Sequence, residues 1–203
     1  MKLSLALFLG LSAVGCASQR VYLNRDVTTA VVLAPLNQTL NRDAPWKMWS
    51  YIEREVASRG YRIVPHDRVW KFYESKKFTE DPGQINEYSN EELAKEFNVD
   101  AVIWSTLHSW DPQLLGIYNS IEVKIEAELH DRKGTVLWRG EGRDGYSSGG
   151  LSTKSILGGV FGAATTSPEK YAPGAAANCF SELPWAGWDP KAPKDAAPPP
   201  EVK

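Results

Sequence analysis

The sequence predicts an α/β fold, in which helices pack on a mixed sheet that contains a long antiparallel hairpin. The hairpin is indicated by a strict alternation of apolar and polar residues over 117–129, followed by a turn over 131–134 and a returning strand over 135–142. Before the hairpin, short apolar runs alternate with segments of helical periodicity. The order of strand, helix, strand, two helices and three strands therefore predicts one mixed sheet.

The first strand and the first helix have clear signals. The nearly continuous apolar run over 29–35 is typical of a buried strand that ends at Pro35. A helix is expected to begin after Asp43, which is a suitable N-cap, and to end at Gly60. Its apolar positions recur at helical spacing. They are Trp46, Trp49, Ile52 and Val56.

Five further segments lead to the hairpin. A second strand is expected over 61–64, and a second helix over 66–76. A turn lies within 77–88, where Pro and Gly follow Asp. The capping box Ser89-Asn90-Glu91-Glu92 opens a short third helix. The strand over 101–110 then precedes the hairpin.

The first strand of the hairpin has one apolar face and one charged face. Because successive side chains of a strand point to opposite sides, the charged face is expected to meet solvent. After the hairpin, 145–150 is interpreted as a flexible break, and the apolar, small-residue segment 151–184 as one or two helices. The apolar face is expected to hold Ile117, Ile121, Val123, Ile125, Ala127 and Leu129, and the charged face Glu122, Lys124, Glu126 and Glu128.

The amino terminus has the pattern of a secretory signal peptide. Lys2 precedes an apolar stretch over 3–14, which is too short to span a bilayer, since a spanning helix needs about 20 residues. The sequence Ala13-Val14-Gly15-Cys16 resembles a bacterial lipobox. This resemblance implies cleavage before Cys16 and its modification by acyl chains such as palmitate. Ala17, in place of Asp, implies an outer-membrane address by the enteric sorting rule.

These signals divide the chain of 203 residues into four regions. They are a signal peptide over 1–15, a lipidated tether over 16–28, a single α/β domain over 29–184 and a Pro-rich disordered tail over 185–203. The formal net charge of −2 gives no indication of a nucleic-acid surface. Once Cys16 is acylated, Cys179 has no partner for an intramolecular disulfide and is expected to be a small buried residue.

Four segments carry a resemblance to a known family. They are 30–37, 59–65, 97–103 and 134–140. In these segments the chain resembles bacterial lipoproteins of unknown function that include the neisserial genome-derived antigen lipoprotein. That family has a fold similar to the amino-terminal domain of TolB and to the periplasmic domain of the curli secretion lipoprotein. The resemblance implies an oligomeric accessory lipoprotein of an envelope assembly, with no established catalytic residues.

We therefore predict a non-catalytic accessory or scaffold subunit of an envelope secretion or transport assembly, anchored to the outer membrane by lipid and facing the periplasm. Its predicted partners are the membrane, other envelope proteins and further copies of itself, but not nucleic acid. Neither a metal site nor a cofactor is predicted. The glycines of 156–164 would let another helix approach closely. The residues predicted to contact partners are Trp46, Trp49, Ile156 and Phe161.

Two alternatives remain at this point. A periplasmic binder of a small ligand or a glycan would use Trp104, His108 and Trp110 as a pocket wall, because these residues are expected to share one strand face. A hydrolase would use Ser147, which lies in a G-x-S-x-G sequence. The histidine of a nucleophile elbow follows its serine, whereas all three histidines here precede Ser147, so this alternative is disfavoured.

Overall fold

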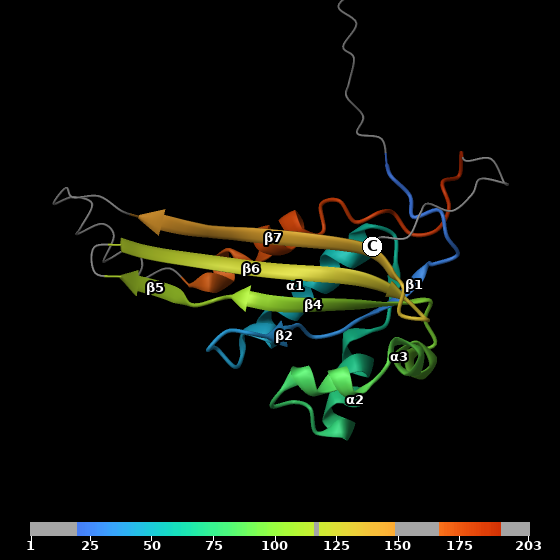
Figure 1. The fold of residues 1–203 in the computed structure, drawn as a ribbon, viewed down its shortest axis with the longest axis horizontal. Coiled ribbons are helices and arrows are strands. Elements are labelled where there is room, and N and C mark those ends of the chain that lie inside the picture. Colours follow the sequence, from blue (N-terminus) through green and yellow to red (C-terminus); the bar gives the residue numbers. More distant parts are fainter. Residues whose placement is uncertain (1–19, 116–117, 149–166, 192–203) are drawn as a thin grey trace, which may run out of the picture.

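A seven-stranded mixed sheet forms the centre of the protein in the part of the chain that the structure describes (Figure 1). The computed structural model describes residues 20–115, 118–148 and 167–191. The elements are β1 (Thr29–Val32), β2 (Leu36–Asn37), α1 (Ala44–Ser58), β3 (Arg62–Ile63), α2 (His66–Lys76), the 3-10 helix η1 (Pro82–Glu87), α3 (Asn90–Phe97), β4 (Ala101–Ser109), β5 (Pro112–Leu115), β6 (Tyr118–Asp131), β7 (Val136–Ser148), the 3-10 helix η2 (Pro168–Lys170) and α5 (Ala172–Cys179).

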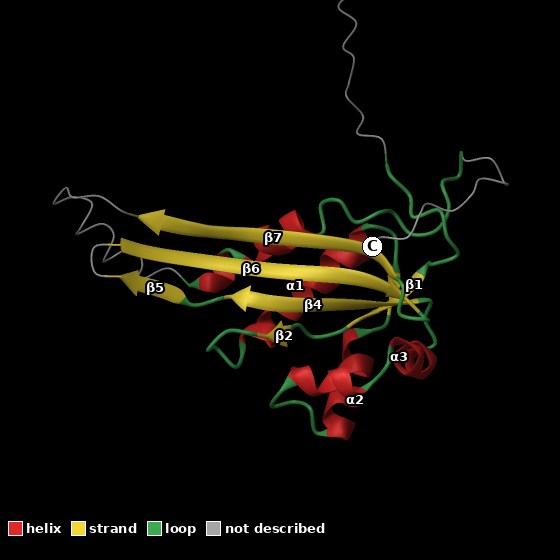
Figure 2. Cartoon of the chain, in the orientation of Figure 1, coloured by secondary structure: helices red, strands yellow, loops and turns green. Residues whose placement is uncertain are grey.

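The pairing of the strands confirms the predicted fold class. β1 runs parallel to β3 and to β4, and β2 pairs with β4 farther along the same strand. β6 is antiparallel to β4, β5 and β7. The hairpin of β6 and β7 lies at the opposite edge of the sheet from β3. Figure 2 shows the two long strands of the hairpin beside β4. The short strands β2 and β5 were not predicted, because two to four residues give no periodic signal.

Helices cover one face of the hairpin and leave the other open. α1 packs on β1, β2 and β3, and α5 packs on β6 and β7 beside α1. The apolar side chains of β6 are buried on this side, whereas its charged side chains lie on the opposite side. Figure 1 looks onto that open side, with α1 and α5 behind the strands. We call it the open face.

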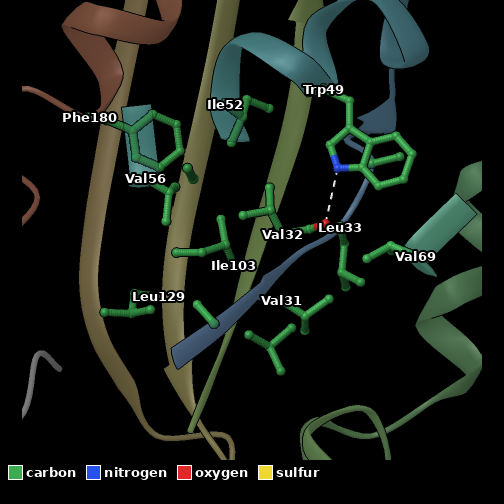
Figure 3. Close-up of a cluster of buried hydrophobic side chains, with 14 of the residues drawn as sticks. Val31, Val32, Leu33, Trp49, Ile52, Val56, Val69, Ile103, Leu129 and Phe180 are labelled. Atoms are coloured by element: carbon green, nitrogen blue, oxygen red, sulfur yellow. Dashed lines mark hydrogen bonds between the residues drawn. The ribbon is translucent and has the colours of Figure 1, made fainter. Parts of the chain in front are cut away.

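The core lies between the sheet and its helices, where long side chains from both interdigitate (Figure 3). Trp49 of α1 is fully buried, and its Nε1 donates a hydrogen bond of 3.0 Å to the Val32 carbonyl oxygen. This bond satisfies the polar atom of a buried indole and ties α1 to the sheet. Other members of the cluster are Val31, Leu33, Ile52, Val56, Ile103, Leu129 and Phe180.

Glycines allow α5 to lie directly on β7. A Cβ atom on Gly140 would overlap the Cys179 carbonyl oxygen, and one on Gly142 would overlap backbone atoms of Ala175 and Cys179. Cys179 is buried in this contact, as expected, and burial raises the pKa of its thiol to about 12. β7 also continues to Ser148, so the prediction of a flexible break is wrong for 145–148.

The predicted tether and tail are both partly ordered, and they bind each other. Leu23 and Val27 are buried, and residues 22 and 185 form a parallel bridge. Leu23 N–H donates to the Trp185 carbonyl oxygen at 2.8 Å, and Gly187 N–H donates to that of Val27 at 3.0 Å. The polar composition of each segment gives no sign of this pairing, because the partners are at least 160 residues apart in sequence. The signal peptide, Cys16 and 192–203 lie outside the described residues.

Several local predictions agree with the structure. α2 spans the expected residues, and α3 begins with the predicted capping box, in which Ser89 and Glu92 bond each other's backbone N–H groups. α1 begins after Asp43, although the Asp43 side chain makes no capping bond. Among the described residues, no helix is long and apolar enough to cross a membrane.

Candidate functional site

The open face carries a groove of about 670 Å³. β4, β6 and β7 form its floor, and the end of η1, the start of α3 and the segment between them form its wall. A volume in this range is typical of sites for small ligands. The lining residues are Leu36, Asn86, Tyr88, Asn90, Trp104, Ser105, Thr106, Glu126, Ala127, Glu128, His130, Arg139, Gly140 and Glu141.

One continuous chain of hydrogen bonds crosses the groove from its wall to β7. The Trp104 Nε1 atom donates to Asn90 Oδ1 at 2.7 Å, and Asn90 Nδ2 lies 3.3 Å from His130 Nδ1. His130 Nε2 lies 2.6 Å from Glu128 Oε2, and Arg139 Nε donates to Glu128 Oε1 at 2.7 Å. The chain therefore fixes five side chains that come from α3, β4, β6 and β7.

The donor-only chemistry of Trp104 determines the orientation of this chain. An indole N–H only donates, so the Asn90 atom that it meets must be the oxygen. The Asn90 amide nitrogen then faces His130 and donates to Nδ1. His130 must carry its proton on Nε2, where it donates to the Glu128 carboxylate.

Glu128 is held as a carboxylate. Burial alone would raise its pKa, but the pKa is lowered, because hydrogen bonds from His130 and Arg139 and the positive charge of Arg139 favour the ionised form. Glu128 therefore presents fixed acceptor oxygens at the centre of the groove. Within the described residues, no three His, Cys, Asp or Glu side chains are placed to hold a metal ion.

A second row of polar side chains runs along the open face beside the first. His108 Nδ1 lies 2.8 Å from Gln38 Oε1, and His108 Nε2 lies 3.2 Å from Glu126 Oε2, without the alignment of a hydrogen bond. Lys124 Nζ lies 3.7 Å from Glu126 Oε1 and 3.2 Å from Glu141 Oε1. On the predicted charged face of β6, the side chains of Lys124, Glu126 and Glu128 are thus paired.

The structure separates the three residues of the predicted pocket wall. Trp104 lines the groove, and half-buried His108 lies farther along the same strand. Trp110 is buried in the core instead, because the pairing of β4 with β6 shifts by one residue between Leu107 and Ser109. Such a bulge reverses the alternation of side chains beyond it. The expectation that Trp110 shares a face with Trp104 is therefore wrong.

The predicted contact residues have different environments. Trp46 is half-buried, and its ring packs edge-on against the ring of Trp70 at a centroid distance of 5.1 Å. Trp49 is fully buried and has no surface to offer a partner. Ile156 and Phe161 lie outside the described residues, as does Cys16.

Ser147 lies within β7, where its backbone is in register with Ser120. A nucleophile elbow needs a sharp turn between a strand and a helix, so the described part of this motif lacks the required geometry. His66 is also remote from the groove. It lies 3.0 Å from Glu53, and its ring packs against that of Trp49 at a centroid distance of 4.2 Å, which makes it part of the contact between α1 and α2.

Sequence reasoning missed the residues that complete the groove. Asn90 was seen only as part of a capping box, and Arg139 only as part of a returning strand. Arg139 had no usable signal, because the pairing of the hairpin shifts between Leu129 and His130, and only this shift places Arg139 opposite Glu128. Asn90 had none either, because its contact with Trp104 depends on how α3 packs against β4.

Comparisons with known proteins agree on the fold. The family model described as "Putative lipoprotein GNA1162-like" matches residues 22–167. The crystal structure of lipoprotein GNA1162 from Neisseria meningitidis is 21% identical, with a TM-score of 0.54, and the match covers 66% of this chain and 94% of that chain. The PelC dodecamer from Paraburkholderia phytofirmans is 15% identical, with a TM-score of 0.50, and the match covers 82% and 96%. The search of the curated proteins finds no match.

Proposed function

The chain belongs to the GNA1162-like lipoprotein family, as its four resembling segments predicted, and from this we propose that it is a lipid-anchored accessory protein of the bacterial envelope. The family match over 22–167 carries the proposal. In its finer form, the protein is a non-catalytic scaffold subunit of a secretion or transport assembly. It is attached to the outer membrane through Cys16 and faces the periplasm.

The length of chain between Cys16 and the domain supports a position close to the bilayer. The Arg20 guanidinium lies over the Trp185 ring at 4.1 Å from its centroid. The backbone N–H of Trp185 donates to the Val21 carbonyl oxygen at 2.8 Å. Four residues span at most about 14 Å. A lipid on Cys16 would therefore hold this end of the domain beside the membrane, where a high effective concentration makes weak contacts with other membrane components sufficient.

Assembly into an oligomer is supported by a protein of similar fold and by the edge of the sheet. PelC, with a TM-score of 0.50, is described as a dodecamer. In this chain β7 pairs only with β6 among the described residues, which leaves a 13-residue strand at the edge of the sheet. The side chain of Asn178 covers one position by donating to the Arg143 carbonyl oxygen at 2.9 Å. Edge strands of this length favour pairing with another chain.

Trp46 remains a candidate contact residue, together with Ile156 and Phe161. Trp46 and Trp70 form a half-buried aromatic pair at the surface of α1 and α2, and aromatic residues are enriched at protein interfaces. Trp49 is no longer proposed, because it is buried.

Crosslinking in intact cells tests the proposal. A photo-reactive residue placed at position 46, 156 or 161 should capture copies of this chain or other envelope proteins. The same residue at the exposed position Lys71 is the matched control. Capture should fall strongly with Cys16→Ala, which should also release the protein from membranes and abolish its labelling by palmitate. Membrane attachment that survives Cys16→Ala would contradict the anchor, and equal capture from Lys71 would contradict the contact surface.

A further inference from the structure

The groove on the open face has the chemistry of a binding site that the scaffold role does not use. From its lining we infer that the groove binds a neutral saccharide, with Trp104 as the surface on which a sugar ring rests. This inference goes beyond the proposed function and does not depend on Cys16 or on assembly.

Each charged side chain of the groove has a partner of opposite charge, although its three carboxylates outnumber Arg139 and the adjacent Lys124 by one. Glu128 is bonded by Arg139 at 2.7 Å and by His130 at 2.6 Å. Glu126 and Glu141 share Lys124, at 3.7 Å and 3.2 Å. An anionic ligand would have to compete with Glu128 for Arg139, and a cationic ligand would have to compete with Lys124. A ligand without charge avoids both costs.

The same network offers hydrogen bonds to hydroxyl groups. A carboxylate has about four acceptor sites, and each carboxylate here uses only some of them within the network. Because His130 and Arg139 hold Glu128 in place, its remaining lone pairs are fixed in direction before a ligand arrives. Hydroxyl groups of a sugar can donate to such acceptors without bringing a charge into the groove, and fixed acceptors lower the entropic cost of binding.

Aromatic surface supplies the apolar part of the site. Trp104 is half-buried, and its indole is held by the bond to Asn90, so the ring has one defined orientation. Tyr88 lines the wall of the groove opposite the strands. A pyranose ring has faces made of C–H groups and a rim of hydroxyls. Such a ring matches a groove with an aromatic surface beside carboxylates and amides, and aromatic surface beside a few placed polar groups is typical of ligand sites.

Binding of defined trisaccharides to the detergent-solubilised full-length chain tests the inference. The neutral probes are triacetylchitotriose and cellotriose, and the charged probes are the chitosan trimer and trigalacturonic acid. At least one neutral probe should bind saturably, as measured by titration calorimetry, and more tightly than either charged probe. Failure of both neutral probes to bind at about 1 mM, or tighter binding of a charged probe, would overturn the inference.

Three variants locate the binding. Trp104→Ala should weaken it at least about 10-fold, whereas Trp104→Phe, which keeps an aromatic face, should retain most of it. Asn86→Ala changes an exposed lining residue without disturbing the core and should weaken binding about 3-fold. Trp188 is an exposed tryptophan outside the groove, so Trp188→Ala should leave the affinity unchanged.

Unchanged affinity in both Trp104→Ala and Asn86→Ala would reject this site. The same results are expected with Cys16→Ala protein, so failure here is distinct from failure of the anchor.

Discussion

Trp49 joins α1 to the sheet through a single polar atom, its Nε1, which donates to the Val32 carbonyl oxygen at 3.0 Å. Trp49→Phe removes this donor and leaves a buried carbonyl without its partner, so we expect the free energy of unfolding to fall by about 1–3 kcal/mol. Urea titration measures the change. Trp188→Phe is the control, because its indole donates to Asp26 at the surface and its loss should cost under about 0.5 kcal/mol. Equal losses of stability in Trp49→Phe and Trp188→Phe would contradict a stabilising role for the bond to Val32.

Asp100 makes the start of the sheet sensitive to acid. Its Oδ2 accepts from the backbone N–H groups of Thr28 and Thr29 at 3.1 and 3.0 Å, and Arg132 lies 3.0 Å from Oδ1. Burial alone would raise the pKa of Asp100, but these bonds and this charge lower it below its ordinary value. A carboxyl whose pKa is lower in the folded state stabilises the fold above its unfolded pKa, and this contribution is lost as the pH falls through the folded pKa.

Asp100→Asn should therefore destabilise the protein by on the order of 1–3 kcal/mol at pH 7, and by less at pH 3. Urea unfolding at both pH values measures the difference. Asp67→Asn is a suitable control, since Asp67 is exposed on α2 and lies 3.9 Å from Lys71. It should change stability by under about 0.5 kcal/mol. An Asp100→Asn loss that is the same at both pH values would contradict the linkage.

The burial of single residues could be predicted from the sequence only in part. Cys179 was correctly predicted to be buried, because small apolar neighbours surround it in sequence. Trp46 and Trp49 lie on the same helical stripe, and both were predicted to contact partners. The stripe identifies the apolar side of α1, but not the depth of each ring. Tyr73 of α2 contacts both rings, whereas only Trp49 also reaches the sheet, where it bonds the Val32 carbonyl oxygen. Trp49 is buried, and Trp46 remains half-exposed.

At the scale of elements, α5 and β7 fit because two positions lack side chains. In Gly142→Val, the new side chain would overlap backbone atoms of Ala175 and Cys179, and α5 must move away from the sheet. We expect a loss of about 1–3 kcal/mol, the range for overpacked cores, measured by thermal unfolding. Glu141→Ala changes the neighbouring residue on the open face and should cost under about 0.5 kcal/mol. A stable Gly142→Val protein would mean that α5 does not lie on β7.

The strongest periodic elements were predictable, and their interruptions were not. The alternation of β6 and the capping box of α3 are local patterns, so the sequence alone indicates them. The bulge near His108 has no such pattern, although it sends Trp110 into the core and leaves Trp104 in the groove. The hydrogen-bonded chain through Asn90 likewise depends on contacts between separate elements. The floor of the candidate site was therefore foreseen in part, and its wall was not.

At the scale of the whole molecule, the two ends of the domain are joined by backbone hydrogen bonds. Leu23 and Asn24 donate to the carbonyl oxygens of Trp185 and Gly187 at 2.8 and 2.9 Å, and Trp185 donates back to Val21 at 2.8 Å. Composition assigned these segments to a tether and a tail, because neither has helical or strand periodicity. Their order comes from pairing with each other and from the burial of Leu23, neither of which a local pattern reveals.

Two truncations test this junction. A chain that ends at residue 191 keeps all of these bonds, whereas a chain that ends at residue 184 loses the partners of 21–27. At about 0.5–1.5 kcal/mol for each of the four backbone hydrogen bonds between the two segments, the shorter chain should be less stable by about 2–6 kcal/mol. The amides of Leu23 and Asn24 should also exchange with solvent faster, as measured by hydrogen exchange. Because Arg20 and Val21 then no longer contact Trp185, the domain would also be able to move farther from a lipid on Cys16. Equal stability and equal exchange in the two chains would contradict the junction and, with it, the argument that the domain lies beside the membrane.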